Sequence, residues 1–197
     1  MNERRRAKET GERRRGTRGM GMNPTRKVTF GGANSLDNYL ARPDHAVDWL
    51  MWGDEAAAVM ADFWKTIDTV LMGRKTYEVA ARSGMGGGYR GVTSYVFSRT
   101  LADPGGGVTV VRDDAPGFVR ELKQKAGKDI CLMGGGELAR PLFEAGLIDE
   151  IGFNIHPVLL GSGIPLFHPM SRQIDLELME CRPFKNGCVY VTYRVKS

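Results

Sequence analysis

The stretch D-I-C-L-M-G-G-G-E-L-A-R, from Asp129 to Arg140, decides the fold. Its first five residues form an apolar, strand-like run, and a helical pattern begins at Glu137. The glycines between them satisfy the G-x-G-x-x-A fingerprint in its required context, with a strand before and a helix after. Such glycines let a diphosphate approach backbone N–H groups at the positive end of a helix. A simple tight turn between strand and helix is the alternative, and it stays open.

A second glycine pattern, G-G-G-Y-R-G from Gly86 to Gly91, also has the G-x-G-x-x-G spacing. It follows a helical pattern and precedes a strand-like run, which is the reverse of the order that a dinucleotide site requires. We therefore expect a flexible loop here.

Outward from the deciding stretch, apolar or β-branched runs alternate with helical patterns. This alternation predicts an α/β protein with a mostly parallel sheet that helices cover on both faces. The expected strands are 27–33, 68–73, 93–98, 108–111, 129–133 and 150–156, and the expected helices are 52–67, 74–82, 116–125 and 137–146.

The C-terminal residues break the alternation, because two strand-like runs, 174–181 and 188–195, follow each other directly. Asn186-Gly187 between them is a strong signal for a two-residue hairpin turn. We expect an antiparallel hairpin in which Cys181 lies opposite Thr192. Cys181 and Cys188 are then out of register for a disulfide.

The chain has 197 residues, of which 42% are hydrophobic and 26% charged, as is typical of a single globular domain. It has three cysteines and three histidines without a C-x-x-C pair, which excludes a structural zinc site and the zinc-deaminase signature. An odd number of cysteines without a secretory signal indicates reduced thiols. We expect a cytoplasmic protein without a metal site.

The net charge of +5 comes entirely from residues 1–24, which contain eight basic and three acidic residues. The remainder carries 20 residues of each sign, so it lacks the basic face of a dedicated nucleic-acid reader. We expect a flexible basic arm over 1–24 and a single domain over 25–197. The longest uncharged stretch, 151–167, contains two prolines and three glycines and is not a membrane span.

Two further segments with polar or basic residues follow predicted strands, at the end where parallel sheets bind ligands. Gly73, Arg74, Lys75 and Thr76 follow one strand, and Ser98, Arg99 and Thr100 end the next. Together with the triple glycine they form three loops that suit a polyanion. This favours NADPH, with its extra 2′-phosphate, over NADH.

The candidate acids near the first helix are Asp37, Asp44, Asp48, Asp54 and Glu55. Asp54 begins that helix, so a role as its N-cap is the simplest interpretation. Asn154 and His156 alternate on one face of a strand, where buried hydrogen-bonding roles are expected for both.

Five motifs, taken in order, resemble the dihydrofolate reductase superfamily, in particular its branch similar to the C-terminal reductase domain of bacterial riboflavin-biosynthesis deaminase-reductases. They are A-N-S-L-D-N-Y-L-A (33–41), D-T-V-L-M-G-R-K-T-Y-E (68–78), Y-V-F-S-R-T (95–100), L-M-G-G-G-E-L-A-R (132–140) and H-P-V-L-L-G-S-G-I-P-L-F (156–167). The resemblance covers Arg26 to the C-terminus. It implies a three-layer α/β/α fold and an NADPH-dependent oxidoreductase that passes hydride to a pteridine-like or ribosylaminopyrimidine small molecule.

The resemblance also assigns residues to the cofactor. Phosphates would be held by Gly73, Arg74, Lys75 and Thr76, the 2′-phosphate side by Ser98, Arg99 and Thr100, and the diphosphate and nicotinamide ribose by Gly134, Gly135, Gly136, Glu137 and Leu138; Ala33, Asp37 and Leu40 would lie beside the nicotinamide. Gly134 stands where the riboflavin reductases carry the glutamate of E-G-G.

In the superfamily the substrate-binding acid follows a tryptophan by five residues, and Trp49 and Asp54 have this spacing. The resemblance therefore makes Asp54 the catalytic residue, with Trp49 and Asn154 as further substrate contacts, and it implies a homodimer with the C-terminal strands near the interface. The alternative function is an NADPH-binding regulatory or nucleic-acid-associated protein that uses the arginine-rich arm without turnover.

Overall fold

The computed structural model describes residues 25–82, 91–102 and 105–196. The basic arm expected over 1–24 lies outside these residues, as does most of the loop expected from Gly86 to Gly91.

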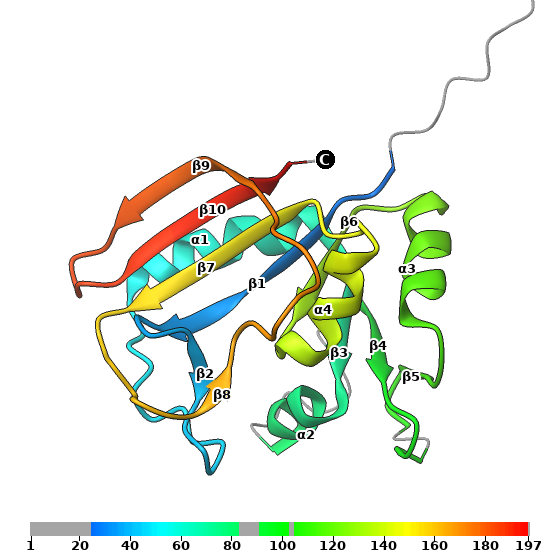
Figure 1. The fold of residues 1–197 in the computed structure, drawn as a ribbon, viewed down its shortest axis with the longest axis horizontal. Helices are drawn as coiled ribbons and strands as arrows, with labels where there is room; N and C mark the ends of the chain where they lie inside the picture. The colour runs from blue at the N-terminus through cyan, green and yellow to red at the C-terminus, as the bar shows by residue number, and fades with distance from the viewer. Residues whose placement is uncertain (1–24, 83–90, 103–104, 197) are drawn as a thin grey trace, which may run out of the picture.

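An eight-stranded sheet forms the centre of the described part of the molecule (Figure 1), in the order β5-β4-β3-β6-β1-β7-β10-β9. The six strands from β5 to β7 are parallel, and β10 and β9 are antiparallel at the far edge. This arrangement confirms the mostly parallel sheet and the antiparallel C-terminal pair. The strands are β1 Val28–Ser35, β3 Ile67–Gly73, β4 Thr93–Phe97, β5 Val108–Val111, β6 Asp129–Met133, β7 Glu150–His156, β9 Leu176–Pro183 and β10 Val189–Val195.

Helices cover both faces of the sheet, which confirms the three-layer fold. The helices are α1 Asp54–Thr66, α2 Arg74–Arg82, α3 Ala115–Gln124 and α4 Gly136–Glu144. Phe63 of α1 and Tyr77 of α2 pack on a cluster around Val70 and Val96. On the opposite face, α3 and α4 pack on a larger cluster around Phe30, whose ring meets those of Phe143, Phe153 and Phe167 edge to face. None of the described helices has the length and apolar character needed to cross a membrane.

The expected helix over 52–67 is too long at both ends. At its beginning, α1 starts only after Gly53, which is the N-cap and has an extended conformation. Trp52 therefore precedes the helix, and it is 80% exposed. Ile67 ends the helix in an extended conformation and begins β3, where it pairs with Asp129 of β6. Pairing with a neighbouring strand outweighs the helical spacing of this β-branched residue.

The predicted register of the C-terminal hairpin is wrong by one residue, since Cys181 lies opposite Val191. The turn has three residues, closed by Phe184 N–H donating to Cys188 O at 2.8 Å. Gly187 has the positive φ of 87°, and the Asn186 side chain accepts from Cys188 N–H at 3.1 Å. A three-residue loop with glycine in the left-handed region replaces the two-residue turn. Cys181 and Cys188 are both free thiols, as expected.

A small second sheet pairs β2 Tyr39–Ala41 with β8 Ile164–Pro165. These strands are too short for a sequence pattern to reveal. Leu166 N–H also donates to Asn38 O at 2.9 Å. The pairing holds the segment after β7 against the segment after β1, beside the carboxyl ends of both strands.

Candidate functional site

The predicted cofactor and substrate segments meet at one edge of the sheet. Strands β4, β3, β6, β1 and β7 are consecutive neighbours and parallel, so their carboxyl ends lie side by side. Each of these ends carries residues that the sequence singles out. In open parallel sheets this edge is where ligands bind.

The triple glycine joins β6 to α4, and its members differ in why they are glycine. A methyl group on Gly134 would lie 2.1 Å from Oγ1 of Thr76, and Gly134 has a φ of +94°. On Gly136 it would lie 2.4 Å from the backbone oxygen of Leu166. Contacts inside the protein therefore require glycine at both positions.

Gly135 has no such requirement. It is the N-cap of α4 with φ −69° and ψ 148°, which any residue adopts, and beyond its chain neighbours the nearest described atom to an added methyl would be Glu137 N at 4.0 Å. Gly73, at the end of neighbouring β3, likewise faces open space within the described structure. Both glycines therefore leave open space beside the backbone, which a ligand could occupy.

The start of α4 fits a phosphate group. No described side chain caps this helix, although Leu138 N–H donates to Gly135 O at 3.2 Å, and the helix dipole favours an anion at this end. Arg74 and Lys75 are exposed at the start of α2, which follows Gly73 directly. Thr76 is half-buried against Gly134. Leu138, half-buried, and Glu137, exposed, lie in the first turn of α4.

A groove of about 310 Å³ lies at the carboxyl ends of β4 and β5. It is lined by Phe97, Ser98, Arg99, Val111, Arg112, Asp113, Asp114 and Ala115. The Ser98 hydroxyl accepts from Thr100 N–H at 3.3 Å and Leu101 N–H at 3.0 Å, which shapes the turn. Arg99 and Thr100 are exposed.

Arg112 was not among the residues predicted from the sequence, and its Nη1 donates to Arg99 O at 3.3 Å. The two arginines therefore lie at one groove. The signal was present, because Arg112 directly follows the V-T-V-V strand as Arg99 closely follows its own strand. Among the acids of the groove, Asp114 is occupied as the N-cap of α3, where it accepts from Gly117 N–H at 2.9 Å.

Trp49, Asn154 and His156 meet on the side of the sheet that α1 covers. Ala33 of β1 and Asn154 of β7 are direct register partners, so the expected nicotinamide and substrate residues are adjacent. The Trp49 ring meets the His156 ring edge to face at 5.3 Å, and the Asn154 amide lies 3.2 Å from Nε2 of His156. Trp49 Nε1 and Asn154 Oδ1 are buried and have no partner in the described residues.

Asp54 is the first residue of α1, and its interpretation as the N-cap is wrong, because Gly53 holds that position. Asp54 is exposed, and its carboxylate has no hydrogen-bond or ion-pair partner among the described residues. The neighbouring Glu55, in contrast, accepts from Lys185 N–H at 2.8 Å and ties α1 to the hairpin. At this helix start, Asp54 is therefore the carboxylate without a partner among the described residues, and its role in binding a substrate stays a prediction.

Asp37 holds two loops together. Its carboxylate accepts from the Ser35 hydroxyl at 2.6 Å and from Leu160 and Gly161 N–H at 3.1 and 2.8 Å. The Ser35 bond is the largest cause that lowers the Asp37 pKa below 3.8. Asp37 thus fixes the loop after β7, whereas Leu40 packs against the core. Direct contact of either residue with a nicotinamide stays a prediction.

A family model described as the RibD C-terminal domain matches residues 26–190. The chain belongs to the RibD C-terminal domain family. Two relatives of the chain come from Bacillus subtilis strain 168. Uncharacterized protein YwjB is 36% identical over 161 residues, which are 81% of this chain and 92% of YwjB. Uncharacterized protein YyaP is 31% identical over 179 residues, covering 85% and 94% of the two chains.

Solved structures confirm the fold. A protein from Shewanella sp. PV-4 named for riboflavin biosynthesis superposes with a TM-score of 0.77 at 21% identity, covering 87% of this chain and 99% of that one. A Thermotoga maritima deaminase/5-amino-6-(5-phosphoribosylamino)uracil reductase gives 0.66 at 15% identity over 87% and 57%. Dihydrofolate reductase from Enterococcus faecalis, complexed with NADP(H), gives 0.64 at 17% identity over 87% and 97%.

Proposed function

We propose that this member of the RibD C-terminal domain family is an NADPH-dependent reductase that transfers hydride to a ribosylaminopyrimidine or pteridine-like heterocycle. The observation that carries the proposal is Gly135, a glycine without a packing or dihedral reason at the uncapped start of α4. The names of two structural neighbours, a phosphoribosylaminouracil reductase and an NADP(H) complex of dihydrofolate reductase, support it.

Different residues at this edge of the sheet would bind different parts of the cofactor. Backbone N–H groups at Gly135 and Gly136 would bind the diphosphate, with Arg74 and Lys75 nearby as counter-charges. Arg99 and Arg112, at the groove beyond β4 and β5, would hold the 2′-phosphate. NADPH supplies the hydride, and the protein supplies position. Ala33 would bring the nicotinamide beside Asn154, its register partner.

Substrate would lie between the nicotinamide position and the start of α1. Trp49 and Asn154 would use their unpartnered polar groups to orient the ring. The Asp54 carboxylate would accept hydrogen bonds from N–H groups of the heterocycle and support protonation of the atom next to the hydride acceptor. An asparagine at position 54 would keep the shape of the Asp54 side chain and lose its negative charge.

The test follows NADPH oxidation by its absorbance, with 5-amino-6-(5-phosphoribosylamino)uracil and dihydrofolate as alternative substrates. We expect turnover of one of them and a loss on the order of a hundredfold in Asp54→Asn, with NADPH affinity unchanged. Asp62→Asn is the matched control, because Asp62 is an exposed acid on the same helix that pairs with Lys65 at 2.8 Å. NADPH binding without oxidation of either compound would contradict the proposal.

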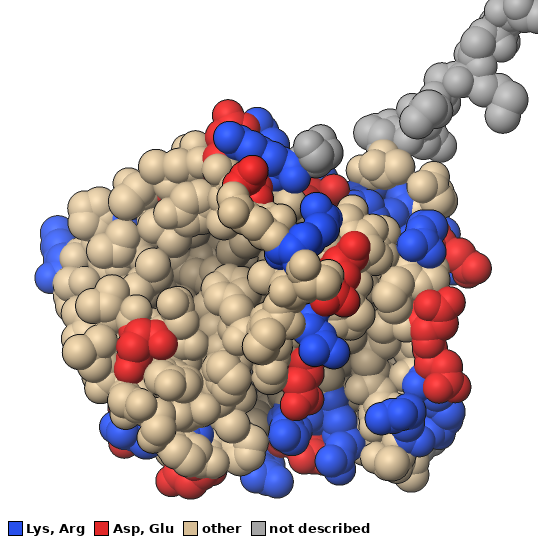
Figure 2. Space-filling model, in the orientation of Figure 1, with Lys and Arg blue, Asp and Glu red and all other residues tan. Residues whose placement is uncertain are grey.

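We also propose that two copies associate through the C-terminal strands. β9 is an edge strand, and Leu178 and Leu176 on it are 57% and 39% exposed. They lie opposite Tyr193 and Val195, on the face that α4 partly covers. Figure 2 shows that charged side chains are sparse over β7, β9 and β10 on this face, which is hollowed there. A second copy would cover these apolar side chains.

A further inference from the structure

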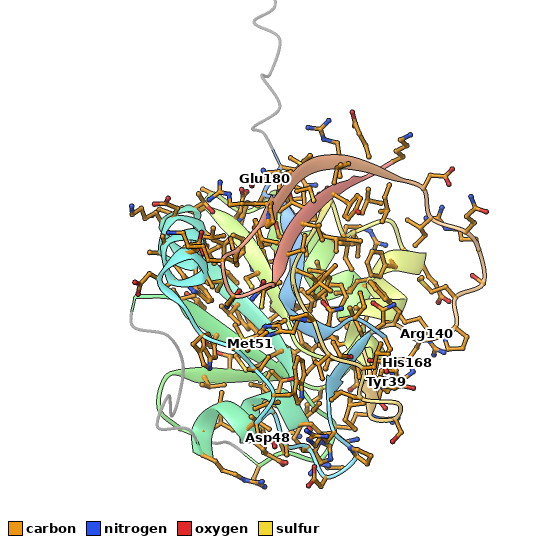
Figure 3. The ribbon with its side chains drawn as sticks, turned by 90° about the vertical axis from the view of Figure 1, so that its left-hand side faces the viewer. Tyr39, Asp48, Met51, Arg140, His168 and Glu180 are labelled. Atoms are coloured by element: carbon orange, nitrogen blue, oxygen red, sulfur yellow. The ribbon has the colours of Figure 1, made fainter. Side chains whose placement is uncertain are left out.

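His156 connects three segments of the chain, and the proposed function leaves it without a role. It is the last residue of β7 and is 1% exposed. Its Nδ1 accepts from Met51 N–H at 3.2 Å and lies 3.4 Å from Cys188 Sγ. Its Nε2 faces Asn154, and Trp49 stands edge-on to its ring. Figure 3 shows Met51 near the middle of this side of the molecule.

The contacts determine which ring nitrogen carries the proton. Burial lowers the pKa of His156, so the ring is neutral at neutral pH. A backbone N–H only donates, so the Nδ1 that receives Met51 N–H must be the unprotonated nitrogen. The single proton of the neutral ring is therefore on Nε2, which then needs an acceptor.

The Asn154 amide is the group that faces Nε2. Its nitrogen is 3.2 Å away, and its buried oxygen has no partner among the residues described. Two donors facing each other are unfavourable. A half-turn of the amide removes this conflict, because the oxygen then accepts from Nε2–H and the NH2 group takes the place of the unpartnered oxygen.

We propose that His156 is a positioning residue that directs the NH2 group of Asn154 toward the substrate, so that Asn154 and Trp49 present N–H donors and the site selects a ring with carbonyl oxygens on the facing edge. This inference rests on the proposed function of the site. A uracil ring has two carbonyl oxygens, whereas a pterin has an amino group in place of one of them. The paired donors therefore favour the ribosylaminouracil over the pteridine, since a donor that meets an amino group stays unpaired.

The first measurement needs no substrate. Long-range ¹H–¹⁵N correlation spectra of the full chain report which histidine nitrogen is protonated, and His156 is assigned by its absence in His156→Asn. We expect the Nε2–H form. An Nδ1–H form would overturn the inference whatever the enzyme does, because Nε2 would then accept from Asn154.

The second measurement uses two substitutions of His156 that separate the contact of Nδ1 with Met51 from the contact of Nε2 with Asn154. Asn at position 156 carries an oxygen near the place of Nδ1 for Met51 N–H and has nothing at the place of Nε2, whereas Gln reaches that place with an amide. We expect His156→Asn to raise KM for 5-amino-6-(5-phosphoribosylamino)uracil about tenfold or more with kcat and NADPH affinity unchanged. His156→Gln should restore part of the loss.

Ser94→Ala is the control for a general effect of changing a buried polar group. Ser94 is 1% exposed on β4, and its hydroxyl has no described partner. Its substitution should leave KM unchanged. An unchanged KM in His156→Asn, or equal losses in the Asn and Gln variants, would reduce His156 to a structural role. Failure of the wild-type protein to reduce either heterocycle would instead defeat the proposed function, and the spectra would still decide the proton position.

Discussion

The glycine turn offers a prediction in which stability and cofactor binding separate. Gly135→Ala places a methyl group in open space on an extended backbone, so folding should tolerate it. Replacing a compatible glycine restricts the unfolded chain, which favours folding by about 0.4–1 kcal/mol, but alanine is a poorer N-cap than glycine by a similar amount. The free energy of unfolding should therefore change by less than about 1 kcal/mol. Gly136→Ala places the methyl 2.4 Å from the backbone oxygen of Leu166, which cannot rotate away. Overpacking of this kind should cost about 1–3 kcal/mol.

NADPH affinity should respond differently in these two variants. At Gly135 the added methyl would occupy the space that we assign to the diphosphate, so Kd should rise about tenfold or more, which corresponds to about 1.4 kcal/mol. Urea unfolding measures stability, and calorimetric titration with NADPH measures Kd. Wild-type NADPH affinity in a stable Gly135→Ala protein would show that the glycine turn serves the fold alone. It would refute the proposed binding of the diphosphate at this turn.

Three other predictions concern the rest of the molecule. Wild-type protein should bind NADPH more tightly than NADH, and Ala at both Arg99 and Arg112, the residues that we assign to the 2′-phosphate, should abolish the difference. Equal affinities for the two cofactors in the wild type would contradict this prediction. The wild-type protein should sediment as the proposed dimer and Leu178→Lys as a monomer, whereas a wild-type monomer at tens of micromolar would contradict the proposed interface. The lowered Asp37 pKa should add stability above about pH 3.9, the unfolded value, and this contribution should disappear as the pH falls through the lower folded value. The stability of Asp37→Asn should therefore fall less steeply than that of the wild type as the pH is lowered. Identical acid-unfolding curves for the two proteins would exclude this stabilising role of Asp37.

The sequence alone was sufficient to predict the strands and helices whose own residues show a clear apolar run or a helical spacing. The strand after the first helix, the helix at 74–82 and the strand at 129–133 follow from runs of apolar residues and helical spacing, both local properties. Alternation of strands and helices then implied a parallel sheet, and a parallel sheet places all its carboxyl ends at one edge. For this reason the sequence alone is enough to group the candidate loops at one edge of the sheet.

Tertiary structure decided what depends on distant partners. The pairing of β2 with β8, the hairpin register and the place of Arg112 beside Arg99 each depend on the relative position of two segments, which the local pattern of neither segment determines. The glycines show the same division: the sequence marks three alike, but only Thr76 and the backbone of Leu166, brought in by other elements, distinguish Gly135 from its neighbours. His156 is the clearest case. Its proton position depends on Met51, 105 residues away along the chain, because a hydrogen bond is specified by atoms in space.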